Sequence, residues 1–428
     1  MKVLMFGWEF PPHITGGLGT ACYGLAKGLL KQGVEVVFVV PKAYGDEDNN
    51  VAHIVNASDM EIDLRNKIYQ RYWNNLTYIE IGSKLVPYMG FNDYLRLEKK
   101  LQVEGENIED GFYKRKFSFS GKYQSNLMEE VHQYALTAAM IATQYDYDII
   151  HAHDWLCYEA GIAAKAASGK PLVIHVHATE FDRSGENVNQ VVYDIERRGM
   201  QAADKVMTVS NLTRQIVIER YGVDPAKVFT VYNAVEPITI KKKVEFKKHF
   251  PEKVVTFLGR ITFQKGPEYF VEAANQVLQQ DENVRFVMAG SGDLLYKTVR
   301  RVAELGMGSK FHFTGFLKGV DVDRMFLMSD VYVMPSISEP FGISPLEAMR
   351  AGVPVVISNQ SGASEILKNA LKVDFWDVDA MANAIYGLLH YPTLHKHLSV
   401  KGVEEVDSLK WENAALSNLK IYHKALSK

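Results

Sequence analysis

Two glutamates near the end of the chain, Glu339 and Glu347, flank a Phe-Gly turn. Apolar spacing predicts a strand at 330–334, a loop that carries Glu339 and a helix at 344–350 that carries Glu347. In open α/β sheets, ligands bind at loops that leave the carboxyl ends of strands, and a helix N-terminus preceded by glycine binds anions. Carboxylates at such a place can accept sugar hydroxyls, so the segment suits a nucleotide sugar. The simpler alternative is a charged helix start with one exposed glutamate.

Two cations occupy a second predicted loop. Arg260 and Lys265 lie between a buried strand at 254–258 and a helix at 267–278. Fixed cations at a strand end can neutralise a diphosphate and stabilise it as a leaving group. The pair therefore supports a phosphate-binding interpretation.

Glycines follow two further predicted strands. Gly290 ends the strand at 284–289, where the alternative is an ordinary turn. Gly16 and Gly17 lie between the strand at 2–6 and the next helix, although they do not fit the G-x-G-x-x-G pattern. Adjacent glycines let a backbone approach a ligand at a helix N-terminus, and the alternative is a loop that requires positive φ.

In combination, these motifs resemble the retaining glycosyltransferases of the glycosyltransferase B fold, and more narrowly the family-four enzymes and the glycogen and starch synthases. The resemblance extends from Val3 to about Ile366. The matching motifs are, in chain order, the loop Gly16-Gly17-Leu18-Gly19, His151-Ala152-His153-Asp154-Trp155, His177 at a strand end, Ser210-Asn211, Gly259-Arg260 with Lys265-Gly266, and the glutamates Glu339 and Glu347.

The resemblance implies an α/β fold with two Rossmann-like, doubly wound domains that face a central cleft. It implies catalytic roles at the donor sugar and its diphosphate for Glu339, His177, Arg260 and Lys265. Contacts to donor or acceptor are implied for Gly16, Gly17, Asp154, Trp155, Gly290, Phe341, Gly342, Ile343 and Glu347. No metal and no cofactor are expected, and the anomeric configuration of the donor would be retained.

The expected reaction moves a hexose, with glucose the first expectation, from UDP- or ADP-glucose to an α-glucan. The glucan acceptor rests on the His-Ala-His-Asp-Trp resemblance. Bacterial ADP-glucose-dependent starch synthases usually carry lysine in the glycine loop, whereas Ile14 precedes Thr15 here. No cation is supplied at that position, so UDP-glucose is at least as well supported as ADP-glucose.

Three alternatives stay open at this point. One is a glycosyltransferase with a lipid or small-sugar acceptor, for example a mannosyl transferase. Another is a non-catalytic sugar or nucleotide sensor, because a fold does not fix a function. The third is a metallohydrolase, for which alternating histidines and nearby acids would supply ligands: His151, His153, His175, His177, Asp154 and Asp182.

Alternation of strands and helices predicts parallel sheets. The expected strands are 2–6, 34–40, 148–152, 171–176, 205–209 and 227–231 in the first half, then 253–258, 284–289, 310–314, 330–334 and 353–357 in the second. The expected domains are residues 1–238, with an irregular insertion at about 42–125, and residues 253–408. A lysine-rich linker joins them at 236–252. A helix at 411–425 lies in a C-terminal segment, 409–428, which the resemblance implies crosses back to the first domain.

The insertion is rich in aromatic residues, which suit an acceptor surface, a peripheral membrane contact or a small separate core. Charged residues make up 23% of the chain and the net charge is −3, which gives no electrostatic case for nucleic acid. No leader peptide and no membrane-spanning run are expected. The two cysteines, Cys22 and Cys157, are expected to be free core thiols, which favours a cytoplasmic protein. The sequence makes no prediction about oligomeric state.

Overall fold

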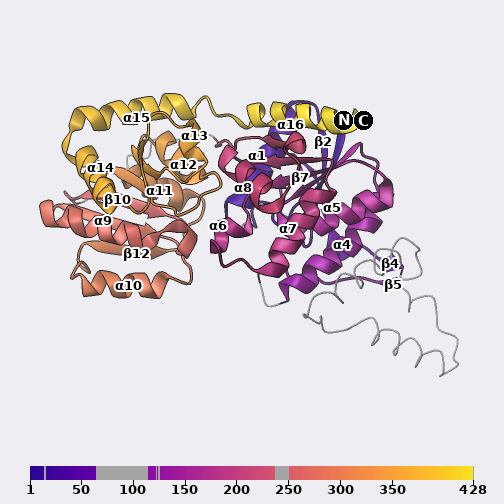
Figure 1. Cartoon of the computed structure of the whole chain (residues 1–428), viewed down its shortest axis with the longest axis horizontal. Coiled ribbons are helices and arrows are strands. Elements are labelled where there is room, and N and C mark those ends of the chain that lie inside the picture. Colours follow the sequence, from indigo (N-terminus) through magenta and orange to yellow (C-terminus); the bar gives the residue numbers. More distant parts are fainter. Residues whose placement is uncertain (14–15, 64–113, 122, 124–125, 237–249, 428) are drawn as a thin grey trace, which may run out of the picture. The chain divides into compact units, whose positions relative to one another are not determined.

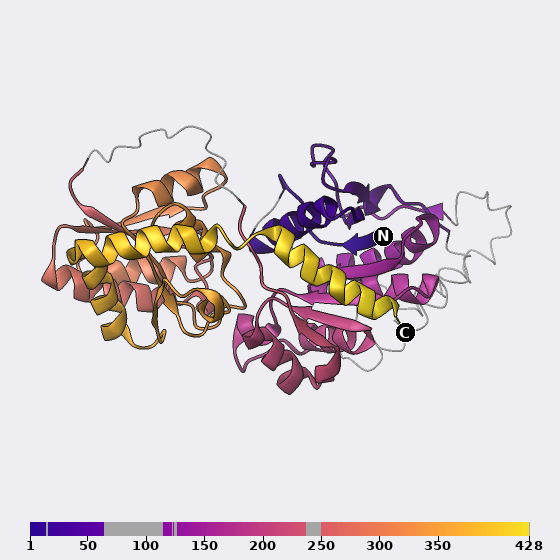
Figure 2. The same cartoon turned by 90° about the horizontal axis from the view of Figure 1, so that it is seen from above.

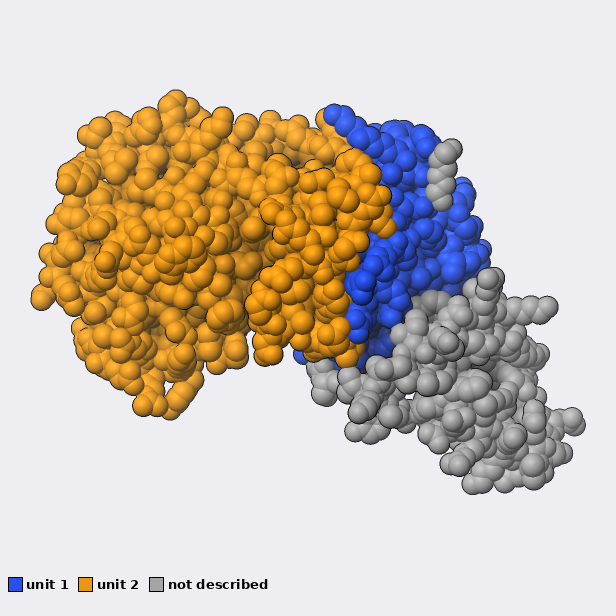
Figure 3. All heavy atoms as spheres, viewed as in Figure 1, with its two compact units in different colours: residues 1–176, 194–207, 418–428 blue, residues 177–193, 208–417 orange. Residues whose placement is uncertain are grey.

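The computed structural model describes residues 1–13, 16–63, 114–121, 123, 126–236 and 250–427. Most aromatic residues of the expected insertion and most of the expected linker therefore lie outside the described residues. The chain divides into two compact units (Figure 3). Unit 1 contains residues 1–176, 194–207 and 418–428, and unit 2 contains residues 177–193 and 208–417.

The first sheet has seven strands in the order β3-β2-β1-β6-β7-β8-β9, and the strand pairs from β3 to β7 are parallel. Its strands are β1 (Lys2–Phe6), β2 (Glu35–Val40), β3 (His53–Asn56), β6 (Ile149–His153), β7 (Leu172–Val176), β8 (Lys205–Thr208) and β9 (Val228–Thr230). The helices of this part are α1 (Gly17–Lys31), α4 (Leu127–Gln144), α5 (Trp155–Ser168), α6 (Glu180–Ser184), α7 (Gln190–Ala202) and α8 (Asn211–Tyr221). Two short strands, β4 (Ile62–Asp63) and β5 (Lys114–Arg115), pair antiparallel.

The second sheet has six parallel strands in the order β12-β11-β10-β13-β14-β15. Its strands are β10 (Lys253–Leu258), β11 (Val284–Ala289), β12 (Phe311–Gly315), β13 (Val331–Met334), β14 (Val355–Ser358) and β15 (Leu371–Val373). The helices that follow are α9 (Pro267–Gln280), α10 (Leu295–Glu304), α11 (Val320–Met328), α12 (Ile343–Arg350), α13 (Ala363–Ile366), α14 (Val378–His390), α15 (Pro392–Val406) and α16 (Trp411–Leu426) (Figure 1).

Helices cover both faces of the second sheet. Successive side chains of a strand point to opposite faces. Val331 and Val333 accordingly join the core beneath α9, α10 and α14, whereas Tyr332 and Met334 join the core beneath α11 and α12. Strands buried on both faces are apolar throughout, which explains why these strands could be recognised in the sequence.

Strand order defines the position of each candidate site. In both sheets the strand that comes first in the sequence lies inside the sheet, and the chain winds outward first in one direction and then in the other. The switch falls between β1 and β6 in the first sheet and between β10 and β13 in the second. Ligands of open α/β sheets bind outside the carboxyl ends of the strands at such a switch point.

The predicted α/β class with two parallel sheets is confirmed. All eleven predicted strands are present to within about two residues, and β3 and β15 are additional edge strands. The helix expected at 411–425 is α16, the yellow helix that ends at the C-terminus in Figure 2. Its residues 418–426 belong to unit 1. Cys22 and Cys157 are buried and free, as predicted. None of the helices in the described residues combines the length and the apolar character needed to cross a membrane.

Candidate functional site

Two loops of unit 2 meet at the switch point of the second sheet. The lysine loop, residues 259–266, follows β10, and the glutamate loop, residues 335–342, follows β13. Lys265 Nζ forms an ion pair and hydrogen bond with Glu339 Oε2. The Lys265 side chain is 21% exposed and that of Glu339 is 9% exposed, so water screens the pair only in part. The structure thus brings together two of the predicted catalytic residues.

Backbone contacts fix the lysine loop against the glutamate loop. Ile337 N–H donates to the carbonyl of Gln264 at 2.9 Å. Gly266 has φ +63°, and a Cβ there would lie 2.2 Å from the carbonyl oxygen of Pro335. Glycine is required here both by its conformation and by the space between the loops.

The other side of the glutamate loop is held by residues 360–362. Glu339 N–H donates to the carbonyl of Gln360 at 2.9 Å, and Gly362 N–H donates to the carbonyl of Glu339 at 2.9 Å. Ser336 Oγ donates to Glu339 Oε2 at 3.3 Å. Backbone and carboxylate of Glu339 are therefore both oriented before any ligand binds.

The loop after β11, residues 290–294, packs directly on the lysine loop. Gly290 has φ +145°, and a Cβ there would lie 1.8 Å from the carbonyl oxygen of Gly259. Ile261 N–H donates to the carbonyl of Ser291 at 2.9 Å. The side chain of Arg260 is exposed within this pair of loops. The structure therefore places Gly290 against Gly259 and Ile261, the two residues that flank Arg260.

Helix α12 begins where the glutamate loop ends. Its N-cap is Gly342, with φ +96°, and no described side chain caps this end. Uncapped N–H groups with the helix dipole favour an anion. Phe341 is buried in the core of this face, and Ile343 is half-buried. Phe341, Gly342 and Ile343, for which the resemblance implies substrate contacts, are thus consecutive residues at the start of α12.

Glu347 lies on the same helix and is half-buried. Burial raises the pKa of Glu347; Arg350 opposes this shift and Asp323 adds to it. Burial likewise lowers the pKa of Arg350. Glu347 can therefore hold or share a proton more readily than an exposed glutamate.

His177 follows β7 and opens unit 2. Burial lowers the pKa of its imidazole to about 3, so the ring is neutral near pH 7. A neutral imidazole has one N–H donor and one acceptor nitrogen. It is thus suited to hydrogen-bond a sugar hydroxyl rather than to act as a fixed charge.

Asp182 contacts the glutamate loop, which the sequence did not reveal. The sequence pattern indicates Asp182 only as a candidate metal ligand, whereas in the structure its Oδ1 accepts a hydrogen bond from Ser338 Oγ at 2.6 Å. The Thr-x-x-Asp pattern at Thr179 is a variant of the capping-box signature and could have identified Asp182 as a helix-start residue. Nothing in the local sequence indicates the partner Ser338.

The predicted acceptor-side residues lie in unit 1, at the switch point of the first sheet. Gly16, the N-cap of α1, is extended at φ −176°, and Gly17 opens the helix. Neither glycine has positive φ, and a Cβ at either would meet none of the described atoms within 4 Å. Asp154 is the one non-glycine residue with positive φ in the described part of the chain, at +61°. Trp155 begins α5 and is half-buried.

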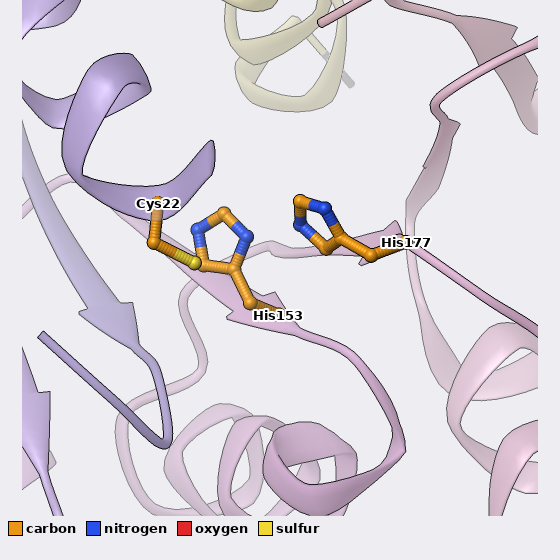
Figure 4. Close-up of side chains that lie close together, drawn as sticks. All are labelled: Cys22, His153 and His177. Carbon is orange, nitrogen blue, oxygen red and sulfur yellow. The ribbon is translucent and has the colours of Figure 1, made fainter. Parts of the chain in front are cut away.

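Three buried histidines lie beneath this region of unit 1. The ring centroids of His151 and His153 are 4.2 Å apart, and each is 5.4 Å from that of His175. His151 Nδ1 is hydrogen-bonded to Tyr422 Oη at 2.6 Å. Nitrogen atoms of the three rings lie within 4.8 Å of one another, so these residues could hold a metal ion. Figure 4 shows the thiol of Cys22 beside His153.

Comparison with known proteins identifies the family. A model of the starch synthase catalytic domain matches residues 2–230, and a model of glycosyl transferases group 1 matches residues 239–404. An uncharacterized glycosyltransferase of Methanocaldococcus jannaschii is 28% identical over 443 residues, which cover 100% of this chain and 99% of the relative. A glycogen synthase of Mycobacterium tuberculosis is 23% identical, over 99% of this chain and 94% of the relative.

A solved structure shares the fold. Sucrose-phosphate synthase from Thermosynechococcus elongatus aligns with a TM-score of 0.71 and 18% identity, over 99% of this chain and 98% of that one. The starch synthase model alone covers more than half of the sequence. The chain is therefore a hexosyltransferase with the glycosyltransferase B fold, and it belongs to the family of starch synthase catalytic domains.

Proposed function

We propose that this enzyme transfers glucose from a nucleotide sugar, UDP-glucose or ADP-glucose, to an α-glucan with retention of the anomeric configuration. Residues 253–408 would form the donor-binding domain, and residues 1–238 would supply the acceptor side. The single observation that carries the proposal is the ion pair between Lys265 and Glu339. The ion pair brings the Lys265 ammonium, which suits a diphosphate, next to the Glu339 carboxylate, which suits sugar hydroxyls. Both groups lie at the switch point between β10 and β13.

The leaving group would be stabilised by the lysine loop. Arg260 is exposed and Lys265 is partly exposed, so both can reach a diphosphate. The uncapped N-terminus of α12 adds N–H groups to the same site. Two cations and a helix end can neutralise the charge that develops on a departing nucleoside diphosphate without a metal ion.

The sugar and the ribose would be held by carboxylates and one imidazole. Glu339 would orient the donor sugar and stabilise developing positive charge, rather than attack it covalently. His177, which is neutral, would hydrogen-bond a sugar hydroxyl. Glu347 would bind the ribose hydroxyls from α12. The neutral form of His177 is the one that its burial favours.

The acceptor assignment rests on Asp154 and Trp155. Asp154 is held in a left-handed conformation that is unfavourable for a non-glycine residue, and such strain is concentrated at functional sites. Its carboxylate can accept from sugar hydroxyls, and the Trp155 indole can stack on a sugar face. The glycogen synthase of M. tuberculosis aligns over nearly the whole chain, which supports a glucan acceptor.

A donor and acceptor screen tests the proposal. Purified enzyme is incubated with UDP-glucose, ADP-glucose or GDP-mannose, each with glycogen, maltooligosaccharides, a lipid acceptor or no acceptor. The readouts are released nucleoside diphosphate, label in product, and the anomeric configuration of the new linkage by NMR. We expect glucosyl transfer to glycogen or maltooligosaccharide with an α-linkage.

Three outcomes would contradict parts of the proposal. Label that enters only the lipid would exclude the glucan acceptor. Consumption of the mannosyl donor alone would exclude glucose while leaving the phosphate-binding role of the lysine loop intact. An inverted product would exclude the retaining mechanism.

A further inference from the structure

We propose that Asp182 is a positioning residue that ties the segment beginning at His177 to the glutamate loop. The inference rests on the proposed function, because it gives His177 and Glu339 their roles at the donor sugar. Asp182 and Ser338 both belong to unit 2, and the hydrogen bond between them spans 156 positions of sequence. Through it, one carboxylate connects the segments that carry two of the proposed donor-sugar contacts.

The His177 segment is fixed by one oxygen of this carboxylate. Asp182 Oδ2 accepts from the backbone N–H of Thr179 at 2.7 Å and from Thr179 Oγ1 at 2.7 Å. In return, the Thr179 hydroxyl accepts from Asp182 N–H, which completes a capping box at the start of α6. Only Ala178 separates Thr179 from His177. The capping box therefore limits the positions that the His177 backbone can take.

The second oxygen has a different partner. Oδ1 accepts from Ser338 Oγ at 2.6 Å, and Ser338 directly precedes Glu339. A helix cap needs only one carboxylate oxygen, so the contact to Ser338 is additional to what α6 requires. Asp182 is 1% exposed. One of its carboxylate oxygens binds the segment of Thr179 and the other binds Ser338.

The environment makes this contact strong. Burial raises the pKa of Asp182, and the hydrogen bonds from Ser338 and Thr179 and the charge of Arg183 oppose that shift. A buried carboxylate is costly unless its hydrogen bonds are complete, and charge-assisted hydrogen bonds are stronger than neutral ones. Removal of Ser338 Oγ would leave one oxygen of a buried carboxylate without this donor.

A double-mutant cycle with Ser338→Ala and Asp182→Asn tests the inference by activity. Misplacement of reacting groups raises the barrier, so we expect kcat to fall about tenfold or more in each single variant while KM for the donor changes little. Both changes break the same link. The double variant should therefore be no slower than Asp182→Asn alone, which is the signature of coupled residues.

The matched control is Ser399→Ala. Ser399 is a half-buried serine of unit 2 that donates to the carbonyl of Gly352 at 2.5 Å, away from the glutamate loop. Ser399→Ala removes the same hydroxyl oxygen together with a hydrogen bond to a neutral carbonyl, and we expect its kcat to be unchanged. A loss of thermal stability in Ser338→Ala with unchanged kcat would overturn the inference in favour of a purely structural contact. Additive effects in the double variant would overturn it as well.

A second measurement separates this inference from the proposed function. Hydrogen–deuterium exchange can follow peptides that cover residues 177–184 and 336–342 in wild-type enzyme and in Ser338→Ala. We expect faster exchange in both peptides, whatever the sugar donor proves to be. Faster exchange in 336–342 alone would show that the two segments are not tied. Failure of every glucosyl donor would count only against the proposed function.

Discussion

At the scale of single residues, the central contact is the one between Lys265 and Glu339. An ammonium group has three N–H donors, so Lys265 can bind a diphosphate and still donate to Glu339. The ion pair already restricts the Lys265 side chain, so little side-chain entropy would be lost when a diphosphate binds. Preorganisation of this kind is how a charged group stabilises a transition state without having to reorient.

Lys265→Ala is predicted to lower kcat/KM for the donor by about two orders of magnitude, as for loss of one preorganised donor. The control is Lys297→Ala, because Lys297 pairs with Glu268 on the surface of the same unit, with side chains 66% and 53% exposed. Steady-state kinetics measure both variants. Circular dichroism checks the fold, since Glu339 loses its partner in a poorly hydrated place. An unchanged kcat/KM in folded Lys265→Ala would remove Lys265 from the site.

The predictability of single residues depends on how far their partners lie along the chain. Lys265 and Glu339 could be proposed from sequence because each follows a recognisable buried strand and precedes a helix. The contact between Asp182 and Ser338 could not, since it depends on how distant segments of unit 2 pack. Likewise, the left-handed conformation of Asp154 has no local signature, because aspartate occurs equally at ordinary helix starts.

At the scale of elements, glycines let the site loops pack backbone against backbone. A Cβ on Gly292 would lie 2.3 Å from the carbonyl oxygen of Ile261, and one on Gly290 would lie 1.8 Å from that of Gly259. The lysine loop can keep this shape because Gly290 and Gly292, which contact it, have no side chains. Arg260 lies between these two contact points and takes its position from them.

Gly292→Ala is predicted to reduce the free energy of unfolding by about 1–3 kcal/mol through overpacking, and to lower kcat/KM by displacing the lysine loop. The control is Gly308→Ala in the same unit, where a Cβ would meet nothing within 4 Å and the backbone has no positive φ. Thermal unfolding and steady-state kinetics compare the two. Equal behaviour of both variants would show that the contact between Gly292 and Ile261 does not hold the loop.

The strands show what a sequence pattern can and cannot predict at this scale. Central strands such as β10 and β11 are mostly apolar, as expected where helices cover both faces of a sheet, and they were predicted nearly to the residue. The edge strands β3 and β15 have four and three residues, with exposed or half-buried side chains at most positions. Segments this short do not differ from loops in composition, so their pairing is visible only in the structure.

At the scale of the whole molecule, the sequence predicted two parallel sheets and the family, because both follow from the order of elements and motifs. The composition of the two units could not be predicted. Residues 177–193 follow β7 of the first sheet, and residues 208–236 include its strand β9, yet by their contacts both segments belong to unit 2. This grouping results from contacts such as Asp182 with Ser338 and not from any local signal.

Chelation by EDTA is predicted to leave activity unchanged, because in the proposed site Arg260 and Lys265 would supply the positive charge that a diphosphate requires. We also expect elemental analysis to find no stoichiometric zinc. The measurement is informative because His151, His153 and His175 have nitrogen atoms close enough to hold an ion. Zinc at one per chain, with activity lost on its removal, would show that the transfer depends on a metal ion.

The return of residues 418–428 to unit 1 has a consequence for biosynthesis. Tyr422, whose hydroxyl is bonded to His151 in the first sheet, leaves the ribosome only after all of unit 2 has been synthesised. At typical translation speeds, the roughly 210 intervening residues take roughly 10 to 40 s. During that interval nascent unit 2 can complete its core while unit 1 waits for its last helix. Although most of unit 1 is synthesised first, it would thus be the last to complete its fold, and it would depend on chaperones for longer than unit 2.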